Sequence, residues 1–167
     1  MKRRIKKLKL KRRLEGKTDY KARASLLKAE LPRFVVRKSN SYIVSQIVKT
    51  EVAQDKVVAT SNSRELEKYG WQHNKKNISA SYLTGFLIAR KVSKLGITRA
   101  VLDIGIHRST KGSRIYACLK GAIDGGLNIP YSEEVLPSEE RLRGVHIKEN
   151  IQKDIAEVIN KIKAKLG

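Results

Sequence analysis

The spacing of apolar residues divides the chain into a strand-rich first part and a helix-rich second part. Runs rich in branched and aromatic residues occupy positions 33–38, 42–49 and 56–60, with short polar links between them. Runs of this kind joined by short links are typical of an antiparallel meander. We therefore expect three consecutive antiparallel strands.

The segments around these strands carry apolar residues every three or four positions, which is the period of a helix. This spacing predicts helices from about 19 to before Pro32, from about 79 to 95, from about 113 to 124 and from 147 to 166, with a short one from about Arg64. A near-continuous apolar run at 97–104 predicts a strand buried on both faces. The predicted class is α/β, with a mixed sheet that combines the antiparallel meander and a parallel strand, and with helices packed on it.

Composition and the helix boundaries together suggest three parts in the 167-residue chain. Residues 1–17 form a basic arm, 18–135 an α/β core domain, and 136–167 a C-terminal helical segment. Too few aliphatic residues lie in the arm to order it alone, so we expect it to order on a partner.

The charge of the chain points to a polyanionic partner. Lys and Arg number 37 against 16 Asp and Glu, which gives a net charge of +21 and a pI near 10.3. Such an excess repels itself in a compact chain unless a polyanion neutralises it. Nucleic acid is the first candidate and an anionic membrane surface the second, although no stretch approaches the roughly 20 apolar residues of a membrane span.

The arm carries the densest positive charge. Residues 1–40 hold 16 basic and 3 acidic side chains, a net charge of +13. A solvated tail is the alternative, but a tail this dense on a basic domain favours phosphate binding. The arm residues predicted to bind RNA are Lys2, Arg3, Arg4, Lys6, Lys7, Lys9, Lys11, Arg12, Arg13 and Lys17.

The first predicted hairpin combines several groups that suit RNA. Arg37 can fork onto a phosphate, Ser39 and Asn40 can reach a 2′-hydroxyl, and Tyr42 can stack on a base, with Lys38 adding charge. An ordinary Asn-containing turn with solvated charges explains the same residues equally well.

A second polar loop precedes the helix at 113. Arg108, Lys111 and Arg114 surround small hydroxyl residues there, and a helix N-terminus favours an anion. The loop lacks the pattern of a nucleotide-binding P-loop. His107 is interpreted as a packing or surface residue. Trp71 is included among candidate RNA contacts because it can stack on a base, although closing a small core is the alternative favoured by its size.

Candidate catalytic groups are scarce. The single cysteine, Cys118, lies on an apolar helix face and suits a core thiol, and it permits no internal disulfide. No zinc quartet is possible with one cysteine. Residues 33–50 contain no Asp or Glu, so a metal-dependent nuclease site at the first strand is missing. We predict that the chain is not an enzyme and uses no cofactor or metal.

Seven ordered segments resemble one known family, large-subunit ribosomal protein eighteen of the archaeal type. The segments are 13–20 (RLEGKTDY), 32–40 (PRFVVRKSN), 63–71 (SRELEKYGW), 81–87 (SYLTGFL), 100–105 (AVLDIG), 113–126 and 136–146 (LPSEERLRGVH). The chain departs from the family at 108–113, where RSTKGS replaces a proline-containing loop.

The resemblance implies a ribonuclease-H-like core, and binding to 5S rRNA and large-subunit rRNA in the central protuberance beside neighbouring ribosomal proteins. It supports Thr18 and Tyr20 as RNA contacts, because they lie in the matching segment at 13–20. Arg23, which follows that segment, is also predicted to contact RNA. The expected location is the ribosome in the cytoplasm, with no membrane partner and no homo-oligomer. A chromatin or membrane-surface protein would explain only the charge.

Overall fold

The centre of the molecule is a four-stranded mixed sheet. The computed structural model describes residues 10–51, 54–145 and 151–166. The strands are β1 (Arg33–Lys38), β2 (Ile43–Glu51), β3 (Gln54–Asn62) and β4 (Val101–Asp103), in the order β3-β2-β1-β4. β1 pairs antiparallel with β2, β2 with β3 in the same way, and β4 lies parallel to β1. The predicted α/β class with a mixed sheet is confirmed.

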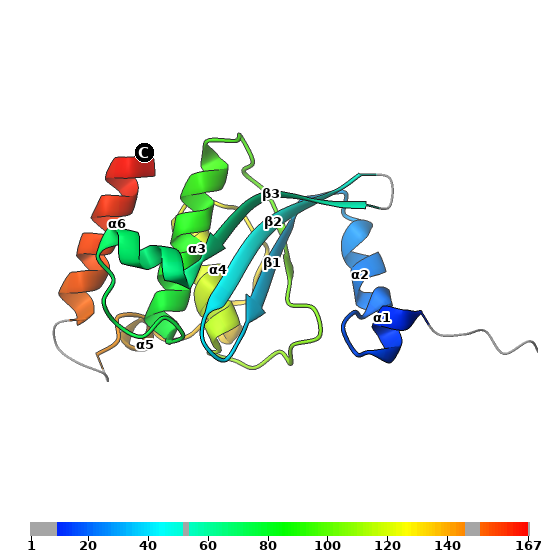
Figure 1. Cartoon of the computed structure of the whole chain (residues 1–167), viewed down its shortest axis with the longest axis horizontal. Coiled ribbons are helices and arrows are strands. Elements are labelled where there is room, and N and C mark those ends of the chain that lie inside the picture. Colours follow the sequence, from blue (N-terminus) through cyan, green and yellow to red (C-terminus); the bar gives the residue numbers. More distant parts are fainter. Residues whose placement is uncertain (1–9, 52–53, 146–150, 167) are drawn as a thin grey trace, which may run out of the picture.

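Helices cover both faces of this sheet (Figure 1). α1 (Lys11–Leu14) and α2 (Tyr20–Leu27) lie on one side, α3 and α4 lie on the other, and α6 lies outside α3. The remaining bounds are η1 (Ser63–Tyr69), a 3-10 helix, α3 (Ile78–Ser93), α4 (Arg114–Asp124), η2 (Glu133–Val135), α5 (Glu139–Leu142) and α6 (Ile151–Leu166).

The strand predicted at 97–104 is much shorter than expected. β4 spans three residues, and Arg99 makes an isolated bridge to Asn128 instead. The Asn128 amide donates to the carbonyl of Thr98 at 2.8 Å, and the Ala100 amide donates to the carbonyl of Asn128 at 3.1 Å. The first half of the apolar run therefore pairs with the segment that follows α4.

One other predicted boundary was wrong by a few residues, and the predicted start of the last helix is not described. The polar turn expected at 53–55 is shorter, because Gln54 and Asp55 already pair with Glu51 and Thr50 in the β2–β3 hairpin. α6 is described from Ile151, whereas the prediction began at 147; positions 147–150 lie outside the described residues.

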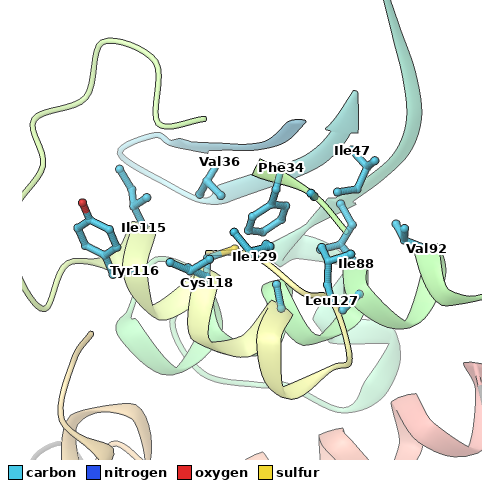
Figure 2. Packing of buried hydrophobic residues seen from close by; sticks show 14 of the residues in the cluster. Phe34, Val36, Ile47, Ile88, Val92, Ile115, Tyr116, Cys118, Leu127 and Ile129 are labelled. Carbon is cyan, nitrogen blue, oxygen red and sulfur yellow. The ribbon is translucent and has the colours of Figure 1, made fainter. Parts of the chain in front are cut away.

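The first hydrophobic core lies between the sheet and the helix pair α3 and α4. Figure 2 shows Phe34 and Val36 directed from β1 toward α4, which contributes Ile115 and Cys118. Phe34 is fully buried. Burial raises the pKa of the Cys118 thiol to about 12, which fits the predicted core thiol.

A second core lies on the other side of α3. Leu83 and Phe86 of α3 meet Leu66 of η1 and the α6 face formed by Ile151, Ile155, Val158 and Ile162. α3 is therefore buried on two sides, which accounts for its nearly continuous apolar sequence.

Two glycines allow α3 and α4 to touch through their backbones. A Cβ atom built on Gly85 would overlap the carbonyl oxygen of Cys118, and one built on Gly121 would overlap the carbonyl oxygen of Tyr82. Each helix thus provides a glycine where the other presents a carbonyl group. Any side chain at either position forces the helices apart.

We expect Gly85→Ala to destabilise the protein by about 1–3 kcal/mol, because overpacking outweighs the gain of roughly 1 kcal/mol that alanine brings to a helix interior. Gly121→Ala should behave alike. The free energy of unfolding from urea denaturation, followed by circular dichroism, measures both. Greater stability in either variant would contradict a backbone contact at this point.

Gly96→Ala is the matched control. Gly96 has a φ of +69° and nothing lies within 4 Å of a built Cβ, so only backbone strain of about 1–2 kcal/mol is expected. The slope of the unfolding free energy against urea concentration should be unchanged in the control, since no helix has to move.

Candidate nucleic-acid interface

The N-terminal segment sits over the sheet face that α3 and α4 leave open. Asp19 caps α2, since its Oδ1 accepts from the amides of Lys21 and Ala22 at 2.9 and 3.1 Å. Arg12 reaches back from α1 and donates to the hydroxyl of Thr18 at 2.9 Å. No residue of α2 is fully buried, so apolar packing alone does not hold this segment on the sheet.

A network of ion pairs joins the N-terminal segment to three strands. Arg23 of α2 lies 3.0 Å from Asp55 of β3, which lies 2.6 Å from Arg33 of β1. Arg33 also donates to Asp103 of β4 at 2.7 Å, and Asp103 binds Arg37 at 3.1 Å. Side chains of Arg33 and Asp103 are 5% and 6% exposed, so this central pair is nearly excluded from solvent.

The network fixes the charge state of its carboxylates. Burial alone would raise the pKa of Asp103, but the charge of Arg37 and hydrogen bonds from Arg37, Arg33 and the Gly105 amide outweigh it and lower that pKa. The pKa of Asp55 is lowered in the same way, against its own burial, chiefly by Arg33. Both aspartates therefore stay ionised at neutral pH.

Arg37 is less free than the sequence suggested. Its Nη1 donates to the carbonyls of Val36 and Asp103 at 2.9 and 2.8 Å, and its guanidinium lies directly against Gly105. The side chain is still 41% exposed. An RNA contact by Arg37 stays a prediction.

At the tip between β1 and β2, some polar side chains build the turn and others are exposed. The Ser39 hydroxyl builds the turn, accepting from the Ser41 and Tyr42 amides and donating to the Tyr42 carbonyl. Asn40 is exposed at the tip. The Arg64 guanidinium lies 4.4 Å from the centre of the Tyr42 ring, so Arg64 covers one face of that ring.

The loop between β4 and α4 is basic and partly tied down. Lys111 pairs with Glu134 at 3.0 Å, and the hydroxyls of Ser109 and Tyr116 are 2.5 Å apart. Arg108 is exposed. Burial, followed by the charges of Lys38 and Arg37 on the neighbouring hairpin, lowers the pKa of His107.

The predicted RNA-binding residues gather around two hollows. One, of about 570 Å³, lies between α2 and the open sheet face and is bordered by Arg12, Lys17, Thr18, Arg23 and Arg37 among others. The other, of about 390 Å³, is bordered by Lys38 and Arg114 among others. Predicted contacts at 2–9 lie outside the described residues.

Comparison with known proteins identifies the family. The model of the family described as ribosomal large subunit proteins 60S L5 and 50S L18 matches residues 4–97 and 93–132. Large ribosomal subunit protein uL18 of Korarchaeum cryptofilum is 53% identical over 141 residues, covering 84% of this chain and 72% of that protein. The chain belongs to the uL18 family. uL18 of Methanoregula boonei is 53% identical over 136 residues (81% and 78% covered), and that of Methanospirillum hungatei is 42% identical over 163 residues (93% of each).

Membership makes the chain a structural constituent of the large ribosomal subunit, located in the ribosome in the cytoplasm, and not an enzyme. The resemblance noted in the sequence is thereby confirmed. Across the residues that the structure describes, no three His, Cys, Asp or Glu side chains are grouped to hold a metal ion. Over the same residues, no helix has the length and apolar character of a membrane span.

Trp71 is placed differently from the other predicted uL18 contacts. Its side chain is 1% exposed and packs in the second core, with the His73 ring edge-on at 5.0 Å between ring centres. The indole is therefore not presented to a base in this structure. Its large apolar area favours the core, the alternative that its size indicated.

Sequence reasoning missed the partners that hold the interface together. Asp55 and Asp103 were single carboxylates in the sequence, and Arg64 was not among the predicted RNA contacts. Their roles depend on residues between 22 and 70 positions away, so no local spacing signals them. One usable signal was Arg33 itself, a cation inside an otherwise apolar strand.

We expect Asp103→Asn to lower the free energy of unfolding at pH 7 by about 3 kcal/mol, because it removes one of the two carboxylates that pair with buried Arg33, and the one that pairs with Arg37. The folded-state pKa of Asp103 is depressed, so this contribution is present above the unfolded pKa of about 3.9 and is lost as pH falls through the folded pKa. Urea unfolding at pH 7 and at pH 3 should show the difference between the two proteins shrinking in acid.

Glu134→Gln provides the control, since it removes a carboxylate from the exposed pair with Lys111. Less than about 1 kcal/mol is expected there. Equal effects of the two substitutions would mean that the Arg33–Asp103 pair does not hold the sheet edge.

Proposed function

We propose that this uL18 protein binds 5S rRNA together with large-subunit rRNA and attaches the 5S rRNA to the subunit in the central protuberance. The proposal extends its established place as a structural constituent of the large subunit. Neighbouring ribosomal proteins of the protuberance are expected partners.

One observation carries the proposal: cations from several elements border both hollows, and the two hollows reach neighbouring residues of the chain. Arg37 borders the first and the next residue, Lys38, borders the second. The loop after β4 also borders both, through Gly105 and Gly112. α1, the β1–β2 turn and this loop all lie along the lower side of the molecule in Figure 1. We use the name basic strip for the cations that border the two hollows: Arg12, Lys17, Arg23, Arg37, Lys38 and Arg114.

A strip of this kind suits folded RNA better than a flat anionic surface. Its cations come from α1, α2, β1 and α4, at different depths around two hollows, so they can follow a curved backbone. The arm carries ten Lys and Arg within residues 1–17, two of which, Arg12 and Lys17, belong to the strip, and the first six of which lie outside the described residues. Phosphate contacts position the protein on the RNA, and the shape of the strip supplies the preference for one folded RNA over another.

The first test concerns RNA preference. We expect nanomolar-range affinity for 5S rRNA near physiological salt, about tenfold or more tighter than for an unrelated structured RNA of equal length. Filter binding of the purified chain to both RNAs across a salt series measures it. Equal affinity for the two would reduce the protein to a general polycation and refute the proposal.

The second test concerns the arm. Deleting 2–9 removes six cations. It should make the slope of log affinity against log salt shallower by up to about 4–5, since each neutralised phosphate contributes about 0.7–0.9. The melting temperature should stay nearly unchanged, because the deletion leaves the Arg12–Thr18 contact in place.

Lys153→Gln with Lys161→Gln is the comparison variant, because both lysines are exposed on α6, away from the basic strip. A small change of slope is expected for this pair. An unchanged slope after deletion of the arm would show that the arm is not a phosphate anchor.

A further inference from the structure

The smaller of the two hollows is bordered by polar and cationic groups beyond the proposed RNA contacts Lys38 and Arg114. It is bordered by Lys38 at the end of β1, Asn77 and Ile78 at the start of α3, Gly112, Ser113 and Arg114 at the start of α4, and Arg141 of α5. No acidic residue borders it. We call it the Arg141 hollow.

Three cations face the hollow from three separate elements without acidic partners. Within the described part of the chain, Lys38, Arg114 and Arg141 form no ion pair, whereas nearby Lys111 and Arg143 pair with Glu134 and Glu139. Arg114 is held in place through one donation to the Lys76 carbonyl at 3.1 Å. Gathering unpaired like charges disfavours the free fold, and an anion would reverse that cost.

Two helices also begin at this hollow. Asn77 caps α3, since its side chain accepts from the Ala80 amide at 2.7 Å. Ser113 occupies the same position in α4 but makes no such bond, and its hydroxyl oxygen is buried without a partner. The first amides of α4, an 11-residue helix, therefore lack a side-chain acceptor beside an unused hydroxyl group.

The backbone at Gly112 keeps the site open. Gly112 has a φ of +66°, and its amide donates to the Val135 carbonyl at 2.9 Å. A built Cβ there would lie 3.8 Å from Nη1 of Arg141, so Arg141 extends across the loop that leads into α4. The guanidinium of Arg141 thus lies beside the turn that presents Ser113.

We propose that the Arg141 hollow binds one backbone phosphate of the rRNA, and that Arg141 is an RNA-contacting residue that the sequence motifs did not indicate. Arg114 and Arg141 donate to the phosphate oxygens and Lys38 adds charge. The Ser113 hydroxyl group, which is buried without a partner in the free protein, turns toward the phosphate and donates to it. The uncapped start of α4 faces the same oxygens. This inference rests on the proposed RNA-binding function and names one of its contacts.

The test compares Arg141→Gln with Arg143→Gln in the full chain. Arg143 lies two positions along and is already paired with exposed Glu139, so the two variants lose the same charge in the same region. We expect Arg141→Gln to weaken 5S rRNA binding about tenfold and to reduce the salt slope by about 1, and Arg143→Gln to change affinity less than about twofold. Melting of the free Arg141→Gln protein should be unchanged or higher, since repulsion is relieved.

Ser113→Ala adds a neutral probe of the same site. It should weaken RNA binding by about two- to fivefold, through a lost hydrogen bond to a charged group, and leave the salt slope unchanged. Equal behaviour of the Arg141 and Arg143 variants, with Ser113→Ala silent, would overturn the inference while leaving 5S rRNA binding intact.

Two further outcomes separate the sources of phosphate. Suppose that millimolar inorganic phosphate raises the melting temperature of the unmodified protein but not of Arg141→Gln, and that Arg141→Gln leaves RNA affinity unchanged. The ligand is then a free anion, and the assignment to RNA fails. If the protein shows no preference for 5S rRNA, the proposed function fails. A greater loss of RNA affinity in Arg141→Gln than in Arg143→Gln would then still uphold the hollow as a phosphate site.

Discussion

Where α3 and α4 come closest, each places a glycine against a carbonyl oxygen of the other, at Gly85 and Gly121. α3 packs on the sheet through one side and on η1 and α6 through the other, so its position sets both cores. The same contact holds the two helices side by side, and residues at the start of both border the Arg141 hollow. A small shift of α4 would therefore change the interior and the basic surface together, because close-packed interiors transmit displacement.

The basic residues of this uL18 protein divide into two kinds with different tasks. Arg23, Arg33 and Arg37 are bound by Asp55 and Asp103, so much of their charge serves to attach the N-terminal segment to the sheet. Lys38, Arg114 and Arg141 have no acidic partner in the described structure and remain available to an anion. Net charge alone cannot distinguish the two kinds, since a neutralised arginine and a free one count equally in the sequence.

Local patterns predicted most of the fold, and long-range pairings account for what they missed. The meander at β1, β2 and β3 follows from branched residues and short links, which act within about ten positions. The shortening of β4 depends on Asn128, and the ion network joins residues up to 70 positions apart. Trp71 shows the limit for the interface: an aromatic residue suits a base or a core, and burial by α6 decides between them.

α6 is the last described element of the chain, and it completes the core that contains the only tryptophan. Synthesis proceeds from the N-terminus, and domains fold as their residues become available. The sheet, α3 and α4 precede α6 along the chain, and Trp71 shares the second core with the apolar face of α6. The indole is consequently a natural fluorophore for the final step of maturation, reporting the docking of α6 separately from formation of the first core.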